Sequence, residues 1–264
     1  MSDTRPLRAD VAPMPVLFVG HGSPTNAVED NNFTRSLAAL GRDLPRPTAI
    51  LVVSAHWLTR GTRTTCTPNP RTIHDFMGFP PELYAMQYPA SGAPTLAREI
   101  AVLAGGACDD TWGFDHASWA ILHHIYPDAD VPLVELSLDA AASPAEHFEV
   151  GSRLASLRDR GVLIVGSGNI VHNLRAMRWD EDAESYPWAI EFDEWVRDRL
   201  EARDDDALID YEQLGYVASL AVSTNEHYLP LLYAAALRRD SDALAFTHTG
   251  IDVGSVSMRC VRFG

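Results

Sequence analysis

Four short, continuously apolar runs constrain the fold of this chain more than any other feature of its sequence. They are VLFVG at 16–20, TAILVVS at 48–54, VPLVELSL at 131–138 and GVLIVGSG at 161–168. Runs of this length, rich in β-branched residues and without alternating polar side chains, are typical of strands buried on both faces. Such strands occur in parallel sheets that helices cover on each side, so the pattern predicts a sheet of this kind.

Amphipathic stretches lie between and after these runs. In six of them apolar residues recur at three- and four-residue spacing, which is typical of helices with one buried face. Their ranges are 32–42, 93–104, 116–126, 144–160, 188–201 and 229–238. The last segment, GSVSMRCVRF at 254–263, alternates in polarity and is predicted to be a strand. We therefore expect a three-layer α/β fold whose central, mostly parallel (mixed) sheet carries helices on both faces.

The length of 264 residues suits one large domain, and the sequence contains neither an internal repeat nor a low-complexity linker. Residues 1–14 are polar and interrupted by prolines, so we predict a flexible tail followed by a single α/β domain over 15–264. The tail lacks the composition of a signal peptide. The longest apolar runs have the length of strands rather than of membrane spans.

The formal net charge of -15 narrows the partners that this protein can bind. A surface this acidic repels a phosphate backbone and an anionic membrane over most of its area. We therefore expect no nucleic-acid partner and no association with membranes.

The three cysteines, Cys66, Cys108 and Cys260, are far apart in the sequence and odd in number. No CxxC pair occurs, so the pattern predicts neither a disulfide framework nor a zinc site made of thiolates. It favours a reducing compartment, and we expect the protein to be cytoplasmic.

Histidines follow three of the four apolar runs. His21 follows the first run, His56 the second and His172 the fourth, whereas Asp139 follows the third. Each histidine, taken singly, is explained as a polar residue that closes a strand or caps a helix. The carboxyl ends of parallel strands meet at one edge of a sheet, however, and ligands bind there. Several neutral imidazoles at this edge predict a site for a divalent transition metal.

The contiguous motifs of other metal and nucleotide sites are missing. The sequence contains no HExxH, no cysteine-based finger, no EF-hand loop and no Walker sequence. It also lacks GxGxxG after the first strand, and it lacks the GxSxG of serine hydrolases. The GSGN segment at 166–169 is either a backbone nest for an anion or a tight strand-to-helix turn.

Six segments, in order along roughly residues 15–238, together form a pattern that is more specific than any single motif. They are LFVGHGSPTNAVEDN, PTAILVVSAHWLTRG, PRTIHDFMGFPPELYAMQYPA, WGFDHASWAILHHIYPDADVPLVELSLD, GVLIVGSGNIVHNLR and STNEHYLPLLYA. In these segments the sequence resembles the DODA-type extradiol aromatic-ring-opening dioxygenases, a branch of the class III, LigB-like superfamily that includes 4,5-DOPA enzymes.

The resemblance implies an enzyme that opens a catechol ring, with a small aromatic diol and O2 as substrates. It implies one divalent metal per chain, Zn(II) or Fe(II), because an all-nitrogen site is compatible with both. His21 and His56 match the family's two strand-end metal ligands. His227 matches the third ligand, and the adjacent Glu226 is the alternative.

Two further histidines match positions around the substrate in this family. His172 matches the catalytic acid–base histidine, and His116 matches a second catalytic histidine of the pocket. A neutral histidine can accept a proton from a substrate hydroxyl at neutral pH. His123 shares a helix face with His116, so it either approaches the pocket or is a packed or solvated helix histidine, and the consecutive His124 points to another side. His147 and His248 are interpreted as structural.

A proline-rich loop at 70–81 carries the sequence His-Asp-Phe at 74–76. Loops of this length without regular structure are often functional. Together with Trp57, Tyr84 and Tyr88 it forms an aromatic lid over a flat substrate, or else these aromatic residues hold the loop on the core.

Two other functions stay open beside ring opening. Three histidines around one metal also suit a zinc-dependent hydrolase that uses metal-bound water, or a non-catalytic metal-binding module. Oxygen dependence distinguishes the first two functions. Arg71 or Arg175 is a candidate partner for a substrate carboxylate. The oligomeric state, the physiological substrate and the ring bond that is cleaved are left open.

Overall fold

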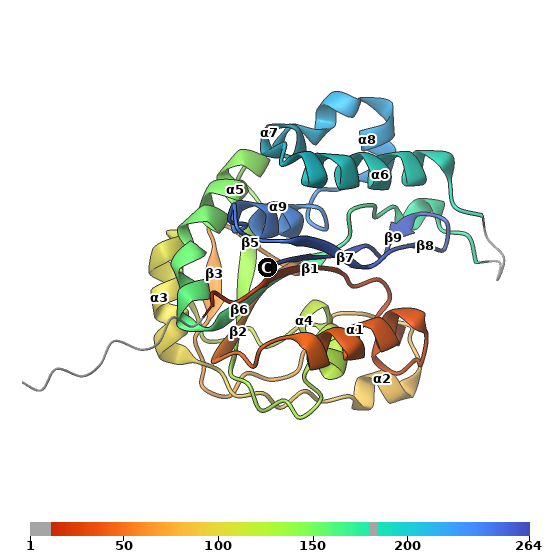
Figure 1. The fold of residues 1–264 in the computed structure, drawn as a ribbon. Helices are drawn as coiled ribbons and strands as arrows, with labels where there is room; N and C mark the ends of the chain where they lie inside the picture. The colour runs from red at the N-terminus through yellow and green to blue at the C-terminus, as the bar shows by residue number, and fades with distance from the viewer. Residues whose placement is uncertain (1–11, 180–183) are drawn as a thin grey trace, which may run out of the picture.

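The computed structural model describes residues 12–179 and 184–264, and Figure 1 shows their fold. Most of the tail predicted over 1–14 therefore lies outside the described residues. At its end, Met14 is buried, and its backbone amide donates a hydrogen bond to the carbonyl of Arg158 at 3.0 Å. The folded part of the chain thus includes Met14.

An eight-stranded sheet forms the centre of the molecule. Its strands are β1 (Val16–Gly20), β2 (Ala49–Thr59), β3 (Arg63–Thr65), β4 (Ala107–Asp109), β5 (Leu133–Asp139), β6 (Val162–Gly168), β7 (Leu244–His248) and β10 (Cys260–Phe263). Their order is β4-β3-β5-β2-β6-β1-β10-β7. The four central strands β5, β2, β6 and β1 run parallel, whereas β3 and β10 pair with them in the antiparallel direction. The sheet is therefore mixed and parallel at its centre, as the apolar runs predict.

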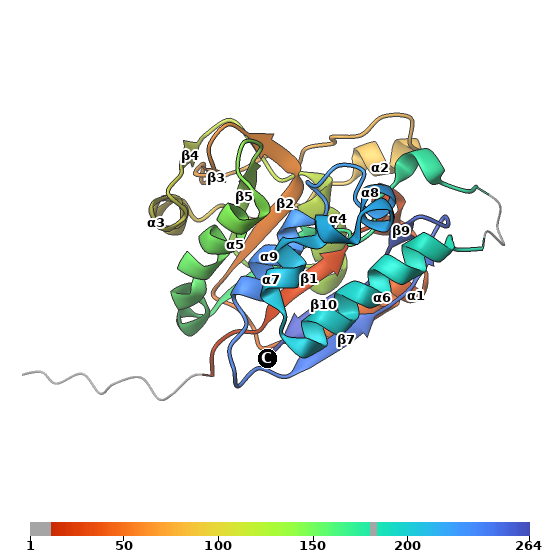
Figure 2. The same ribbon diagram turned by 90° about the horizontal axis from the view of Figure 1, so that it is seen from above.

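Helices cover both faces of this sheet. On one face lie α1 (Asn32–Asp43), α2 (Pro81–Ala85) and α4 (His116–Ile125). The other face carries α3 (Pro94–Ala104), α5 (Pro144–Arg153), α6 (Pro187–Ala202), α7 (Asp205–Ile209), α8 (Tyr216–Ala221) and α9 (Leu229–Ala236). Figure 2 shows α5, α9 and α6 laid across this second face. The predicted three-layer α/β architecture is confirmed.

Alternate residues of the central strands pack against the helices on opposite faces of the sheet. In β1, Val16 and Phe18 belong to the apolar cluster under α5, α6 and α9, whereas Leu17 and Val19 belong to the cluster under α1 and α4. All four are fully buried. A strand that is apolar at every position can bury both of its faces, which is why the runs contain so few polar residues.

The helix predicted over 144–160 is divided into two elements. α5 starts at Pro144, after the capping box of Ser143, and ends at Arg153. A 3-10 helix, Ala155–Arg160, follows it. Within this turn Arg158 is buried, and its guanidinium pairs with the carboxylate of Asp242. The tighter winding thus accompanies a buried ion pair, which the apolar periodicity could not reveal.

The strand predicted over 254–263 is also divided. β9 (Val256–Ser257) pairs with β8 (Ile251–Asp252) in a separate two-stranded sheet, and only β10 joins the main sheet. Between them Arg259 turns towards α6, where its Nε lies 3.0 Å from Oδ2 of Asp193. This buried pair interrupts the alternation and separates the two strands.

The absence of a disulfide, expected from the cysteine spacing, is wrong. Cys66 and Cys108 are joined by a disulfide, and Cys260 is free and buried. Cys66 directly follows β3, and Cys108 lies in β4, which pairs with β3. Strand pairing therefore brings together two cysteines that are 42 residues apart, and their spacing carries no sign of it. The cytoplasmic location stays a prediction, and the disulfide removes the cysteine argument for it.

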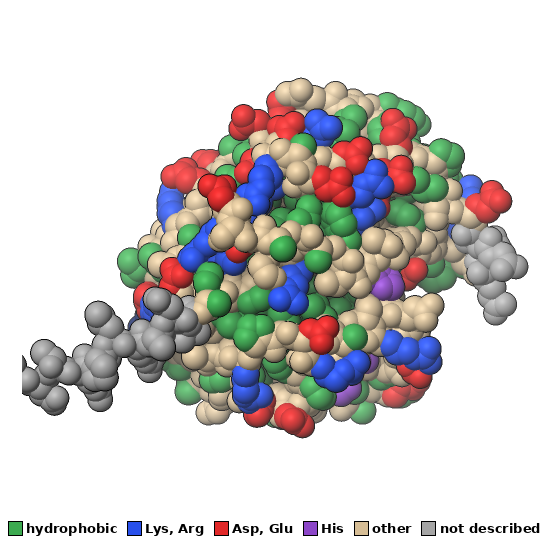
Figure 3. Space-filling view, in the orientation of Figure 1, with side chains coloured by type: hydrophobic (Ala, Val, Ile, Leu, Met, Phe, Trp, Pro, Cys, Tyr) green, Lys and Arg blue, Asp and Glu red, His purple; other side chains and the backbone are tan. Residues whose placement is uncertain are grey.

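The surface mixes charges of both signs. On the face drawn in Figure 3, acidic side chains lie among basic ones, so the negative charge is spread rather than gathered in one area. Among residues 12–179 and 184–264, no helix combines the length and the apolar character that a bilayer span requires.

Candidate metal centre

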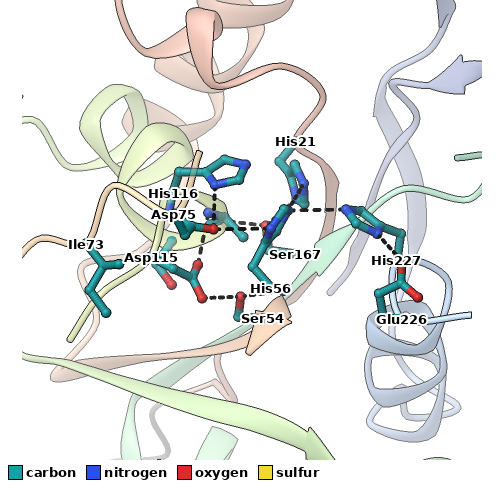
Figure 4. Close-up of polar contacts among 12 residues, drawn as sticks. His21, Ser54, His56, Ile73, Asp75, Asp115, His116, Ser167, Glu226 and His227 are labelled. Atoms are coloured by element: carbon teal, nitrogen blue, oxygen red, sulfur yellow. Dashed lines mark hydrogen bonds and ion pairs between the residues drawn. The ribbon is translucent and has the colours of Figure 1, made fainter. Parts of the chain in front are cut away.

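Three histidines from distant parts of the sequence meet at the carboxyl edge of the central strands (Figure 4). His21 follows β1, His56 lies inside β2, and His227 precedes α9. His56 was expected after its strand, but β2 continues to Thr59 with a register shift between Val53 and Leu58. The irregular register at His56 allows a strand residue to reach the site.

The end of β6 holds His21 and His227 in place. The backbone amide of His21 donates to the carbonyl of Gly168 at 3.0 Å, and that of Asn169 donates to the carbonyl of His227 at 2.8 Å. A Cβ atom on Gly168 would lie only 2.1 Å from the carbonyl oxygen of His227. Glycine is thus required for the approach of His227. The GSGN segment lies mostly within β6 and ends at this contact, rather than forming a separate anion nest.

The three imidazoles have the spacing of metal ligands. Nε2 of His56 lies 3.2 Å from Nε2 of His21 and 3.2 Å from Nε2 of His227. Nitrogens bound tetrahedrally to zinc at about 2.05 Å are about 3.3 Å apart. The three nitrogens therefore fit the coordination sphere of one divalent ion.

The other ring nitrogen of His21 shows which tautomer this histidine adopts. Its Nδ1 lies 3.0 Å from Oγ of Ser167, and the Ser167 hydroxyl donates its only proton to the carbonyl of Ala117 at 2.7 Å. Ser167 can therefore only accept from His21, which places the imidazole proton on Nδ1. The Nε2 lone pair is left free towards the other histidines.

Carboxylates orient the remaining two histidines in the same way. Nδ1 of His56 lies 3.2 Å from Oδ2 of Asp75, and Nδ1 of His227 lies 3.0 Å from Oε1 of Glu226. An ionised carboxylate only accepts hydrogen bonds, so both protons lie on Nδ1 and both Nε2 atoms keep a lone pair. Glu226 thus lies behind His227 rather than between the three Nε2 atoms (Figure 4).

Burial keeps His21 and His227 neutral. It lowers the pKa of His21 and of His227 well below the usual value, and the neighbouring imidazoles lower it further. Burial is the largest influence on His56 and opposes its protonation, but the contact with Asp75 and the nearby carboxylate charges together outweigh it and raise that pKa. Neutral imidazoles packed this closely are the form that a metal cation binds.

His116 lies beside this group at the start of α4. Its Nδ1 lies 2.9 Å from Oδ2 of Asp75, and its backbone amide donates to Oδ1 of the same residue at 2.9 Å. Its ring centroid is 4.0 Å from that of His56. Burial opposes ionisation of Asp75, but the hydrogen bonds from His116 and His56 outweigh it and lower its pKa. The sequence placed Asp75 only in a lid loop, because nothing in its local pattern shows which histidines it contacts.

His172 completes the set of histidines at this edge. Its ring stacks on that of His227 with centroids 3.5 Å apart and planes inclined by 12°. Burial lowers the pKa of His172 to about 4, although the charge of Glu226 opposes this shift. His172 is therefore unprotonated at neutral pH.

The other residues at strand ends and on helices lie elsewhere. Asp139 accepts hydrogen bonds from the backbone amides of Gly61 and Ala141 and does not join the cluster. The remaining histidines contact residues outside the cluster. These contacts are His147 with the Tyr233 hydroxyl, His124 with the Asn26 carbonyl, His74 with the Met86 carbonyl, His123 with the ring of His124, and His248 with the ring of Phe33.

The aromatic residues of the proposed lid divide into two groups. Phe76 packs against Tyr84, and its ring centroid is 5.6 Å from that of His116, so it lies beside the site. Trp57 is buried in a stack with Trp112, and the buried Tyr88 donates its hydroxyl to the carbonyl of Tyr126. These latter side chains hold the chain on the core.

Arg71 and Arg175 are both exposed, and neither forms an ion pair with another described residue. Their pairing with a substrate carboxylate stays a prediction.

Comparison with known proteins shows the family of this chain. Residues 12–254 match the model of the catalytic LigB subunit of aromatic ring-opening dioxygenase. The chain is 48% identical over 259 residues to the 4,5-DOPA dioxygenase extradiol of Escherichia coli (strain K12), with 95% of each protein covered. It is 33% identical over 255 residues to the 4,5-DOPA dioxygenase extradiol of Beta vulgaris, with 93% of this chain and 95% of that protein covered.

A solved structure agrees with these matches. The crystal structure of an uncharacterised protein from Escherichia coli K12 superposes with a TM-score of 0.83 at 43% identity, over 95% of this chain and all of that one. The resemblance found in the sequence is confirmed over nearly the whole length. The chain therefore belongs to the family of the catalytic LigB subunit of aromatic ring-opening dioxygenases and is an enzyme of the extradiol ring-cleaving class.

Proposed function

We propose that this enzyme is a mononuclear, metal-dependent dioxygenase that opens a catechol bearing an amino-acid side chain, such as DOPA. The observation that carries the proposal is the convergence of three Nε2 lone pairs, from His21, His56 and His227, each with its Nδ1 proton held by a neighbour. The names of the relatives from Escherichia coli and Beta vulgaris support the choice of substrate. Residues 15–264 would act as one catalytic domain, because both apolar layers pack on the same sheet.

The proposed ligands are His21, His56 and His227, with one divalent ion per chain. An all-imidazole set binds both Fe(II) and Zn(II). Bound Fe(II) would lower the pKa values of the catechol hydroxyls and supply the redox chemistry that zinc lacks. Glu226 orients His227 in this proposal and is not itself a ligand.

His172 and His116 would handle the protons of the substrate. His172 is neutral and partly accessible, so it can accept a hydroxyl proton of the catechol and return it later in the reaction. His116 donates its Nδ1 proton to Asp75, which leaves the Nε2 lone pair free as a second acceptor. The ring of Phe76, beside His116, would stack on the flat substrate and exclude water.

The decisive test uses protein loaded anaerobically with Fe(II) and then mixed with a panel of catechols in air. We expect oxygen uptake and a yellow semialdehyde product with DOPA, and neither from the His56→Ala variant. Absence of both signals with every catechol would contradict the proposal. Anaerobic turnover of an ester or amide by the zinc-loaded protein would instead identify a hydrolase.

A further inference from the structure

The loop between β3 and α3 (residues 66–93) reaches the metal centre at one carboxylate, that of Asp75. Before this point the loop is held by its backbone, since the amide of Ile73 donates to the carbonyl of Phe114 at 2.7 Å. From His74 to Phe79, no backbone amide donates a hydrogen bond to another described residue. This stretch is held instead by side chains: Asp75 accepts two hydrogen bonds from His116, and its carboxylate contacts Nδ1 of His56.

From this arrangement we infer that Asp75 is a positioning residue that couples the loop to the metal, so that metal binding orders the loop and the ordered loop strengthens metal binding. This inference rests on the proposed metal site. Coupling of this kind is reciprocal, because each event changes the free energy of the other by the same amount.

A single oxygen atom makes the connection. Oδ2 of Asp75 lies 3.2 Å from Nδ1 of His56 and accepts from Nδ1 of His116 at 2.9 Å. Oδ1 accepts from the backbone amide of His116, which fixes the rotation of the carboxylate. When the loop is in place, His56 therefore carries its proton on Nδ1 and offers a lone pair at Nε2. Without Asp75, no other described residue hydrogen-bonds this Nδ1.

The three acceptor contacts make Asp75→Asn more harmful to metal binding than Asp75→Ala. If the Asn amide nitrogen takes the place of Oδ2, it donates to both Nδ1 atoms and drives the imidazole protons onto Nε2, where the metal would bind. Alanine leaves the tautomers free to exchange. A role limited to packing predicts the opposite order, because asparagine is the closer match in shape.

The experiment compares the wild type with Asp75→Asn, Asp75→Ala and the loop control Glu82→Gln, whose side chain is exposed on α2. Zn(II) affinity is measured by competition with a chelator. We expect a loss of about 10- to 100-fold for Asp75→Asn, a smaller loss for Asp75→Ala and none for Glu82→Gln. Nitrogen-15 spectra of the metal-free proteins should place the His56 proton on Nδ1 in the wild type and on Nε2 in Asp75→Asn.

Hydrogen exchange of the loop amides tests the other half of the coupling. Zinc should slow exchange of the hydrogen-bonded amides at the two ends of this stretch, those of Ile73, Leu83 and Met86, in the wild type and in Glu82→Gln, and should have no such effect in either Asp75 variant. Equal zinc affinity in the wild type and Asp75→Asn, or zinc protection that persists in Asp75→Ala, would overturn the inference. These readouts need no turnover, so a wild type that binds zinc but opens no catechol would contradict the proposed function and leave this inference standing.

Discussion

The imidazole of His172 lies face to face with that of His227, with ring centroids 3.5 Å apart. One of these residues is a proposed metal ligand and the other a proposed proton acceptor. The stack buries His172 and holds its ring plane, while the Nδ1 of His227 remains paired with Glu226. The arrangement separates the two roles, since His172 can be changed without removing a ligand.

Replacement of His172 by phenylalanine should keep the stack and remove the proton acceptor. We expect kcat to fall by about 10²-fold or more, which is the usual effect of losing a general base, with zinc affinity unchanged. Steady-state oxygen uptake and chelator competition measure the two effects. His248→Phe, at a histidine that packs on Phe33 away from the site, serves as the control and should retain wild-type kcat. A variant at His172 with normal turnover would exclude the proposed role.

Substitutions at the adjacent residues Glu226 and His227 show which of the two binds the metal and which only orients the metal ligand. His227→Ala should abolish tight metal binding, because it removes one of three nitrogen donors. Glu226→Ala should weaken binding by only about 10-fold, because it removes a hydrogen bond that orients the ligand. Metal content after gel filtration and chelator competition provide the measurement. The reverse order of effects would make Glu226 the ligand.

Glu135 should make stability depend on pH. Its carboxyl group is fully buried in β5, and burial together with the nearby charge of Asp115 raises its pKa well above the usual value. The folded state therefore holds this proton after the unfolded chain has released it, so its contribution to stability is lost as pH rises above about 4.5.

The Glu135→Gln variant tests this dependence because glutamine does not titrate. Melting temperatures of the metal-free wild type and variant are compared from pH 4.5 to 8. The wild type should lose stability relative to the variant as pH rises. A constant difference across this range would show that Glu135 is ionised in the folded protein.

The disulfide between Cys66 and Cys108 should stabilise the edge of the sheet. The residues are 42 positions apart, and closing a loop of this length contributes about 4 kcal/mol in the chain-entropy model. Replacing both cysteines with serine should lower the free energy of unfolding by a comparable amount, measured by denaturant titration. A reductant should destabilise the wild type and have no effect on the double variant. Three free thiols in the denatured, unreduced protein would contradict the pairing.

The local spacing of apolar and polar residues was sufficient to predict most of the fold and part of the site. The apolar runs that became β1, β5 and β6 and the helical ranges that became α1, α3 and α4 were predicted within two residues. Within a helix or strand, the side chains that face the core recur with the period of that element, so a short stretch of sequence is enough to reveal it. The splitting of 144–160 and of 254–263 was missed, because at each break a buried arginine, Arg158 or Arg259, pairs with a carboxylate of a distant segment, which local periodicity does not encode.

The sequence alone determined that the chain is an α/β protein with histidines at the carboxyl ends of its strands, because periodicity and strand ends are local properties. Tertiary structure alone decided what each histidine contacts. Ser167 meets His21 across 146 residues, and one carboxylate of a loop meets both His56 and His116. Hydrogen bonds act over about 3 Å in space and leave no periodic trace along the chain, so the tautomers of the site, like the Cys66–Cys108 pair, exist only once the layers have packed.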